Sequence, residues 1–249
     1  MSTPILINEN NLSIAWLKIF QSIIDHPGKE IMPLVLTLSN FDETDDIKNT
    51  LNIDLKTHGL DSVEVVSETI FPQSLYEYYE RDKKVLFDKY LTQILPRLKK
   101  IDSRNNNGTY FERLISFGNK DNNKNQLDII IDSLNGTNKR RSKLQAAIFD
   151  PLKDHKNGVF QGFPCLQHVT FYRSESGGLV LNSFYAVQYL YQRAYGNWLG
   201  LINLGKFIAK ETNLELERFN CFIGVEQLDH LTKNEAKKLV SKMNIKIND

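Results

Sequence analysis

The sequence predicts one α+β domain that spans residues 1–249, with helices packed on a mainly antiparallel or mixed sheet. Apolar runs of strand length occur between amphipathic stretches with helical spacing, in no regular alternation. Two of the predicted strands follow each other through a loop of hairpin type. The chain shows no internal repeat and no long linker, and 249 residues can bury one sizeable core.

Composition and charge narrow the class of protein. Lys plus Arg number 31 and Asp plus Glu number 30, which gives a formal net charge of +1. Nucleic acids and anionic membrane surfaces are bound through excess positive charge, so neither is expected as a partner. A hydrophobic content of 41% is too high for intrinsic disorder. Two cysteines allow no disulfide framework and no cysteine-rich zinc site, and no metal is expected.

The N-terminal segment lacks the features of a secretory signal. Residues Met1–Glu9 contain no positively charged region followed by an apolar one. No uninterrupted apolar run approaches the roughly 20 residues that span a bilayer. The sequence therefore predicts a cytoplasmic protein that has free thiols and no membrane partner.

The first half of the chain, residues 1–107, carries no motif with a chemical interpretation and is predicted to cover one face of the sheet. Apolar spacing predicts its helices, and apolar or β-branched runs predict its strands. The expected elements are a helix over Trp16–Ile24 capped by Ser13 and ended by Pro27-Gly28, a strand over Met32–Phe41, a short helix over Asp42–Leu55, a strand over Val63–Val66, a long helix over Tyr76–Ile101, and a turn-rich break over Asp102–Gly108.

The second half is predicted to supply most of the sheet. Two long strands joined by the loop Ser174–Gly178 form its clearest feature. The expected elements are a helix over Leu127–Leu134 ended by Asn135-Gly136, strands over Ser142–Phe149, Cys165–Tyr172 and Leu179–Leu190, a helix over Tyr191–Thr212, a strand over Phe219–Val225, and a helix over Lys233–Met243.

Cys165 is the first candidate for chemistry. It follows Pro164, which fixes the backbone at the start of a predicted strand. A thiol at a strand start can face a cleft, although most lone cysteines are small buried hydrophobic residues. Cys221 lies within an apolar strand segment and is predicted to be a core residue.

Several short patterns recur in order between about Gly108 and Asp229. They are Lys139-Arg140-Arg141-Ser142, Phe163-Pro164-Cys165, Phe171-Tyr172, Asn197 in a long helix, and Thr212-Asn213-Leu214-Glu215-Leu216 followed by Phe219. This ordered set resembles the thymidylate synthase family, which includes the dCMP and CMP hydroxymethylases, and it needs no gap over residues 179–219. The resemblance implies a thymidylate-synthase-like fold and a homodimer formed through the sheet face.

The resemblance also implies a role for each matched residue. Cys165 matches the family nucleophile, whose thiolate adds to C6 of a pyrimidine so that C5 can attack a one-carbon unit from 5,10-methylenetetrahydrofolate. Asn197 matches the asparagine that hydrogen-bonds the ring edge, and its amide can pair with N3–H and O4 of a uracil. Arg140 and Arg141 match an arginine pair that reaches the substrate phosphate of the partner subunit. No residue is assigned to cofactor binding.

The chain departs from the family around the nucleophile. Leu166 stands in place of the histidine that follows the cysteine. His168, two positions on, is expected on the same strand face as Leu166 and on the face opposite Cys165, which makes it a poor substitute. In the gapless register Ala186 replaces the arginine that binds phosphate within the same subunit. Arg193 is interpreted as a helix-surface residue, with compensation for the missing arginine left open.

Other departures affect the base, the sugar and the proton-transfer group. The acid that would transfer protons at the pyrimidine cannot be placed, because no candidate glutamate has motif support. The altered positions are Tyr189 for an aspartate at the base, Gln227 and Asp229 for the histidine and tyrosine at the sugar, and Phe111 for a glycine. Residues Ser241–Asp249 contain no counterpart of the family's closing segment. The candidate acids are Glu77, Glu80 and Glu112.

Two functional hypotheses follow. In the first, the protein is a transferase that methylates or hydroxymethylates C5 of a small pyrimidine nucleotide or nucleoside. In the second, it is a catalytically silent homologue that acts as a binding or assembly subunit. Structural interpretations stand beside both, since Arg140-Arg141 could form a solvated basic turn and Asn197 could be a surface amide or a local cap. A chance match of strand and helix patterns is disfavoured by the gapless register.

Overall fold

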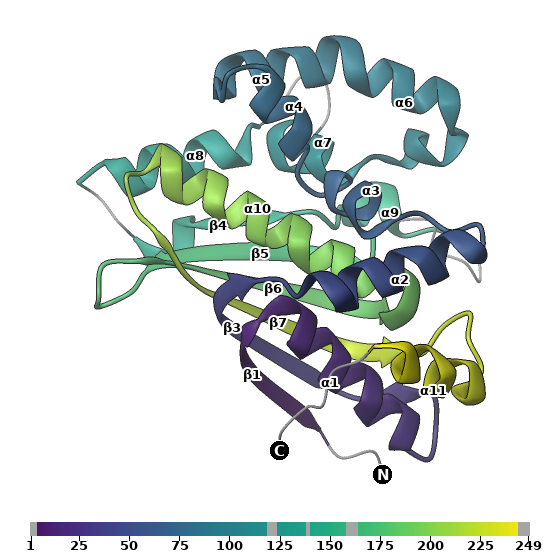
Figure 1. The fold of residues 1–249 in the computed structure, drawn as a ribbon. Helices are drawn as coiled ribbons and strands as arrows, with labels where there is room; N and C mark the ends of the chain where they lie inside the picture. The colour runs from purple at the N-terminus through teal and green to yellow at the C-terminus, as the bar shows by residue number, and fades with distance from the viewer. Residues whose placement is uncertain (1–3, 119–123, 138–139, 158–163, 244–249) are drawn as a thin grey trace.

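The computed structural model describes residues 4–118, 124–137, 140–157 and 164–243. Strands within these residues form one mixed sheet of order β1-β3-β7-β6-β5-β4, with β2 also paired to β7 (Figure 1). The pairs β1–β3 and β6–β7 are parallel and the others are antiparallel. The predicted α+β class and mixed sheet are therefore confirmed. The strands are β1 (Ile5–Asn11), β2 (Glu30–Ile31), β3 (Leu34–Asp42), β4 (Gln145–Ala147), β5 (Leu166–Arg173), β6 (Leu179–Tyr189) and β7 (Leu216–Gln227).

The helices gather on one side of the sheet, with α5 and α6 farther from it than α10 (Figure 1). The buried hydrophobic residues between helices and sheet form one contiguous cluster. No helix in the described part of the chain has the length and apolar character needed to cross a membrane. The helices are α1 (Leu12–Asp25), α2 (Asp45–Thr57), α3 (Val63–Glu68), α4 (Gln73–Tyr78), α5 (Lys83–Lys89), α6 (Leu95–Ile101), α7 (Tyr110–Ile115), α8 (Gln126–Asn135), α9 (Pro151–Asp154), α10 (Tyr195–Glu211) and α11 (Lys233–Lys242), with π-helical turns η1 (Tyr90–Ile94) and η4 (Leu190–Ala194) and 3₁₀ turns η2 (Ser103–Asn107) and η3 (Arg141–Lys143).

The helix predicted near the N-terminus is α1, but its cap differs from the prediction. Asn11, and not Ser13, is the N-cap, because its side chain accepts a hydrogen bond from the Ile14 amide at 3.0 Å. Ser13 is instead buried and its hydroxyl lies 2.7 Å from that of Tyr195. This contact ties α1 to the first turn of α10.

Two predictions in the first half are wrong. Val63–Val66, expected as a strand, begins helix α3, in which Ser62 caps the Val65 amide at 3.4 Å. The long helix over Tyr76–Ile101 is broken, because Glu80 and Arg81 have positive φ angles of 53° and 63° and separate α4 from α5. Strand β1 was not predicted as a strand at all.

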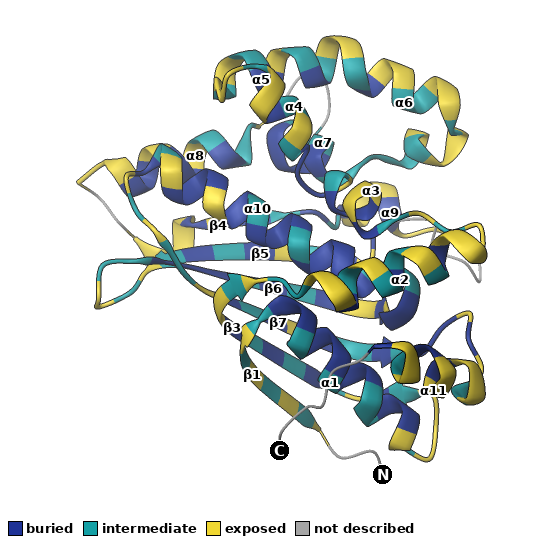
Figure 2. Ribbon diagram, in the orientation of Figure 1, coloured by how far each residue is buried: buried dark blue, intermediate teal, exposed yellow. Residues whose placement is uncertain are grey.

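The sheet face opposite the helices is not covered by any described residue. Buried and exposed positions alternate along β3 and β7 (Figure 2). One row of side chains on this face is a hydrogen-bonded ladder of Thr37, Asn220, Asn182 and Thr170, with contacts of 3.0, 2.8 and 3.1 Å. The next row consists of Val35, Phe222, Phe184 and His168. The rings of Phe222 and Phe184 stack with centroids 5.6 Å apart, and Phe222 is 42% exposed.

Strand β5 is irregular just after the predicted nucleophile. Leu166 pairs with Tyr185, but His168 pairs with Phe184, so one residue of β5 is bulged out between them. Leu166 is fully buried, whereas His168 is exposed and its ring lies 6.1 Å from that of Phe184. The expectation that Leu166 and His168 share a face is therefore wrong, because the bulge reverses the alternation.

The neighbouring strands change alternation at the same level. On β6 the buried residues Tyr185 and Gln188 are three positions apart, and on β7 the buried residues Ile223 and Glu226 are also three apart. Regular strands would place such residues on opposite faces. The coordinated break therefore turns two polar side chains, Gln188 and Glu226, inward.

Candidate functional site

Cys165 lies at the start of β5 with its residue surface exposed. Its carbonyl accepts a hydrogen bond from the Ala186 amide at 3.1 Å, and the side chain of Gln167 donates to the Pro164 carbonyl at 2.8 Å. These contacts hold the backbone that carries the thiol, in line with the predicted strand start. Desolvation raises the pKa of the Cys165 thiol, and the charge of Arg193 partly offsets that rise.

Arg193 lies in η4, directly before α10, and one helical turn before Asn197. Its guanidinium forms an ion pair with Asp61 at 3.1 Å, and the side chain is 39% exposed. The same positive charge offsets part of the burial-driven rise in the pKa of both Cys165 and the Tyr110 hydroxyl. The half-exposed Arg193 therefore fits the predicted helix surface, and its charge also acts on the thiol, so compensation for the missing arginine stays open.

Tyr110 is the second polar side chain beside the thiol. Burial raises its pKa well above the usual value, although hydrogen bonds from the backbone at Leu166 and Cys165 act in the opposite direction. The residue sits at the start of α7, where Thr109 and Glu112 form a reciprocal capping box. This cap fixes the direction in which the first turn of α7 presents Tyr110.

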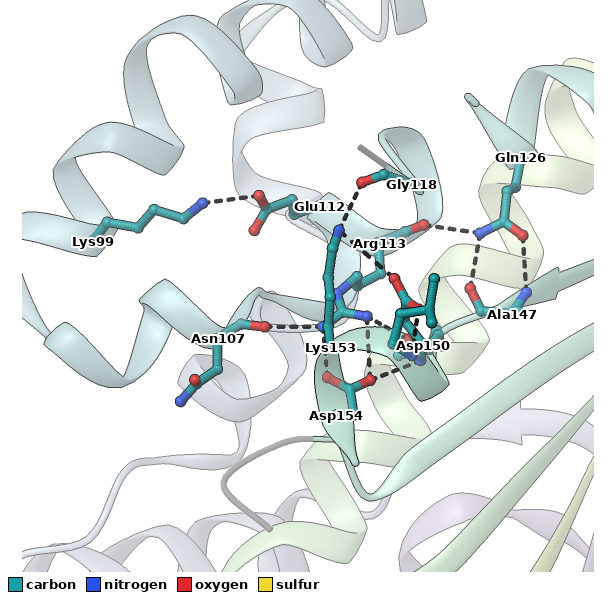
Figure 3. Close-up of polar contacts among 12 residues, drawn as sticks. Lys99, Asn107, Glu112, Arg113, Gly118, Gln126, Ala147, Asp150, Lys153 and Asp154 are labelled. Atoms are coloured by element: carbon teal, nitrogen blue, oxygen red, sulfur yellow. Dashed lines mark hydrogen bonds and ion pairs between the residues drawn. The ribbon is translucent and has the colours of Figure 1, made fainter. Parts of the chain in front are cut away.

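A buried ion pair anchors α7 to the segment that follows β4 (Figure 3). The guanidinium of Arg113 donates to both carboxylate oxygens of Asp154 at 3.2 and 2.8 Å. It also donates to the carbonyls of Ile148 at 3.1 Å and Asn107 at 2.9 Å. The Asp150 amide donates to Asp154 at 2.7 Å. Because the pair is almost fully buried and its donors and acceptors are matched, it holds α7 and α9 in one geometry.

Five buried polar side chains have donor or acceptor atoms without a hydrogen-bond partner among the described residues. Native proteins leave few buried polar groups unpaired, and each such group needs an explanation. We call this group the buried polar cluster. Its members are Tyr185 and Gln188 of β6, Trp198 of α10, Glu226 of β7 and Asp229, which follows β7.

Electrostatic coupling shows that the cluster is continuous with Cys165. Burial raises the pKa of Tyr185 well above its usual value, and the charges of Tyr110, Cys221, Cys165 and Glu226 raise it further. The charges of both Cys165 and Glu226 thus act on Tyr185. A polar molecule bound beside the thiol would meet these unpaired groups on its inner side.

The two carboxyl groups of the cluster are both biased toward the protonated form. Burial, followed by the charge of Asp229, raises the pKa of Glu226 well above its usual value. Burial also raises the pKa of Asp229, against the hydrogen bond that its Oδ1 accepts from the Tyr191 amide at 2.9 Å. Perturbed carboxyl groups of this kind are concentrated at functional sites.

Asn197 is buried in the first turn of α10, whereas the arginine pair is exposed. Asn197 is only 6% exposed in the first turn of α10, so it is not a surface amide. Arg140 and Arg141 are exposed, and the Arg141 guanidinium lies 5.7 Å from the ring centroid of Tyr172. Because seven residues of extended strand separate Tyr172 from Cys165, the pair lies roughly 23 Å from the thiol in the same chain.

Arg141 lines a surface pocket of about 350 Å³ at the far end of β5. Lys139 and Phe163, which belong to the family-like patterns, lie outside the described residues, as does most of Ser241–Asp249. Within the described ranges, no group of three or more His, Cys, Asp or Glu side chains is placed to hold a metal ion.

The candidate acids proposed from sequence have other roles. Glu77 and Glu80 are exposed, and Glu112 both caps α7 and pairs with Lys99 at 2.8 Å. Glu226 was not singled out, because it lies just past the strand predicted over Phe219–Val225. Arg193 could have been found from the Gln192-Arg193 dipeptide, which resembles the family's Gln-Arg stretch but lies outside the gapless register.

No known protein-family model matches the chain, and no curated protein matches it.

Proposed function

We propose that the protein is a thymidylate-synthase-like transferase that binds a pyrimidine nucleotide or nucleoside beside Cys165 and methylates or hydroxymethylates its C5. The observation that supports this proposal is the exposed residue Cys165, on which the Arg193 charge acts, together with Tyr185 of the buried polar cluster, whose pKa the Cys165 charge raises. A nucleophile, a cation that offsets part of the burial penalty on its thiolate, and unpaired donors and acceptors for a polar ring would serve thiol addition to a pyrimidine.

In this proposal the thiolate of Cys165 adds to C6, and the electron pair of the C5–C6 double bond moves toward the ring carbonyl. Arg193 stabilises the thiolate before attack, while Asn197 or the buried polar cluster holds the ring edge. C5 then forms a bond to a one-carbon unit and loses its proton, and departure of the thiolate from C6 restores the C5–C6 double bond. The carrier of that unit would leave through cleavage of its C–N bond, with hydride from the reduced carrier giving a methyl product or water giving a hydroxymethyl product. Cysteine suits both the attack and the departure.

The one-carbon donor implied by the resemblance is 5,10-methylenetetrahydrofolate. Bound, it would supply the electrophilic carbon that C5 attacks. The orphaned atoms of the buried polar cluster are enough for the edge of one heterocycle, and the described residues assign no contacts to a second. No test below depends on the donor.

The proposed assembly is a homodimer formed through the open face of the sheet. The stacked rings of Phe222 and Phe184 give this face an apolar centre beside a polar ladder. A partner seated there would bury both rows. The separation of Arg140 and Arg141 from their own Cys165 also fits an arginine pair that serves the site of the partner subunit.

The test is adduct formation with 5-fluoropyrimidine nucleosides and nucleotides, read by mass spectrometry. We expect an adduct on Cys165 that is lost in Cys165→Ser and kept in Cys221→Ser, because Cys221 is fully buried. Exchange of C5 tritium with water is a second readout that needs only addition, protonation and elimination. If neither readout depends on Cys165, the proposal is refuted.

The silent homologue remains the second candidate because of one observation. Burial raises the pKa of Cys165, which keeps the thiol protonated in the free protein. A silent binding subunit would bind the same nucleotides without an adduct and without tritium exchange. The two readouts above therefore decide between the candidates.

A further inference from the structure

Glu226 is a buried carboxyl group without a partner. It is 0% exposed, and neither of its oxygens has a hydrogen-bond partner among the described residues. On β6 it faces Gln188, which is 2% exposed and has both amide atoms unpaired, and on β2 it faces the apolar Ile31. Two complementary groups on adjacent strands that leave each other unpaired point to a polar molecule that satisfies both.

No positive charge within the described part of the chain acts on the pKa of Glu226. Its titratable neighbours are Asp229 in the following loop, Cys221 on the same strand and Tyr185 on β6. The indole of Trp198 in α10 reaches toward Cys221 but its N–H forms no aligned hydrogen bond. Without a cation nearby, burial keeps Glu226 as a neutral carboxylic acid, with one O–H donor and one carbonyl acceptor.

The position of Glu226 relative to Cys165 follows from the strand register. The Cys165 carbonyl accepts a hydrogen bond from the amide of Ala186 on β6. Two residues further along β6, Gln188 pairs with Glu226 on the adjacent strand β7. Strand geometry then places the Cα atoms of Cys165 and Glu226 roughly 12 Å apart. A span of this order is comparable to two side chains with one six-membered ring between them.

We propose that Glu226 is a substrate-binding residue of this site, which pairs as a neutral acid with an adjacent carbonyl and N–H on the edge of a planar heterocycle. Its O–H donates to the ligand carbonyl and its C=O accepts from the ligand N–H. Gln188 and Trp198 supply further donors and an acceptor beside it. The inference rests on the proposed function in that Cys165 and Glu226 share one ligand.

The same hydrogen bond bears on the chemistry. When the thiolate adds to C6, the S–C6 bond forms, the C5–C6 double bond breaks, and the electron pair delocalises onto the ring carbonyl. A buried neutral acid that donates to that oxygen stabilises the charge as it develops. The proton remains on or shared with Glu226 and returns fully to it when the thiolate leaves.

Two variants separate this role from a structural one. Glu226→Gln keeps one donor and one acceptor but cannot ionise, whereas Glu226→Leu keeps the volume and removes both. Binding is measured by equilibrium dialysis of 2′-deoxyuridine 5′-monophosphate and uridine between pH 6 and 9. The Cys165→Ala background is used, so that no adduct contributes. Circular dichroism checks that each variant is folded.

We expect the dissociation constant of Glu226→Gln to lie within about threefold of that of the parent protein. Glu226→Leu should bind at least about tenfold more weakly, because it loses one or two buried hydrogen bonds. Parent binding should weaken as pH rises through the Glu226 titration, and Glu226→Gln binding should not. In the Cys165-containing protein, Glu226→Gln should slow C5 tritium exchange more than it weakens binding, because an amide is a poorer donor.

Three outcomes would each overturn the inference. They are unchanged binding by Glu226→Leu, the same pH dependence of binding in Glu226→Gln as in the parent, and no binding of either probe by the parent. Unchanged Glu226→Leu binding together with a Cys165 adduct overturns the inference alone. Binding that depends on Glu226 without any adduct or tritium exchange supports the inference and refutes the proposed transfer reaction.

Discussion

Replacing Glu226 by leucine should make the fold more stable, and increasingly so at higher pH. The substitution removes a buried carboxyl group whose oxygens have no partner and puts an apolar side chain of similar volume in its place. Burying an unpaired polar group costs about 1–3 kcal/mol, so we expect a gain of that order at pH 5. Most other substitutions in a protein core destabilise.

The pH dependence follows from the direction of the Glu226 pKa shift. In the unfolded chain the carboxyl ionises near its ordinary value of 4.5, while burial keeps it protonated in the folded protein. Between those two pKa values the folded state holds more protons, so stability falls as pH rises, by about 1.4 kcal/mol per pH unit. Below pH 4.5 this contribution vanishes, and above the folded pKa the loss is complete. Glu226→Leu escapes this loss, so its advantage should widen with pH.

The assay is urea denaturation at pH 5, 6, 7 and 8, followed by circular dichroism. Glu226→Gln is the matched control, because it keeps an unpaired polar group but cannot ionise. It should resemble the wild type at pH 5 and then gain on it as pH rises. Asp229, whose pKa is also raised and whose charge acts on Glu226, titrates in all three proteins, so differences between them report residue 226 together with its coupling to Asp229. A leucine variant less stable than wild type at every pH, or a pH-independent difference, would refute the reasoning.

Three other predictions concern the thiol, the buried ion pair and the open sheet face. Arg193→Gln should slow alkylation of Cys165 by iodoacetamide at pH 8 several-fold, because it removes the cation that lowers the thiol pKa. Asp154→Ala should lower the free energy of unfolding in urea by about 3–5 kcal/mol, because it leaves the Arg113 guanidinium buried without its carboxylate. If the proposed dimer forms through this face, Phe222→Glu should shift it to monomer in sedimentation, because the substitution places a charge on the exposed aromatic row.

Each of these predictions has a control. Arg193→Lys keeps the charge and should retain part of the alkylation rate, and an unchanged rate in Arg193→Gln would contradict the role of Arg193. Asp61→Ala breaks only a half-exposed pair and should cost less than about 1 kcal/mol, so an equal loss in Asp154→Ala would contradict the argument from burial. Ile53→Glu introduces the same charge on exposed α2 and should leave the oligomeric state unchanged.

Elements with a strong local pattern could be predicted from the sequence. The hairpin of β5 and β6 and the helix that contains α10 were found because their apolar spacing and turn residues agree. Helix α3 was missed because Val63 and Val66 favour strands locally. Close packing decides their state, since a Cβ on Gly196 of α10 would lie 2.6 Å from the Val63 carbonyl.

The site was predicted in part for the same reason. Cys165 and Asn197 could be named because they belong to an ordered pattern. Glu226 could not, because its direction depends on a break in alternation shared by three strands, which are joined only in the folded sheet. The electrostatic effect of Arg193 on the thiol could not be read from the sequence, because Arg193 lies in the π-helical turn η4, outside the register of the pattern.

The strand order has a consequence for how the chain comes together during synthesis. Leu38 of β3 pairs with Phe219 of β7, about 180 residues later, and β1 reaches the rest of the sheet only through β3. At ribosomal rates of about 5–20 residues per second, β1 and β3 wait on the order of 10–40 seconds for their partner strand. During that interval both edges of a short parallel pair are exposed. The yield of native protein should therefore depend more on protection of the nascent N-terminal segment, or on early packing of α1 over β1 and β3, than on the free energy of unfolding of the finished fold.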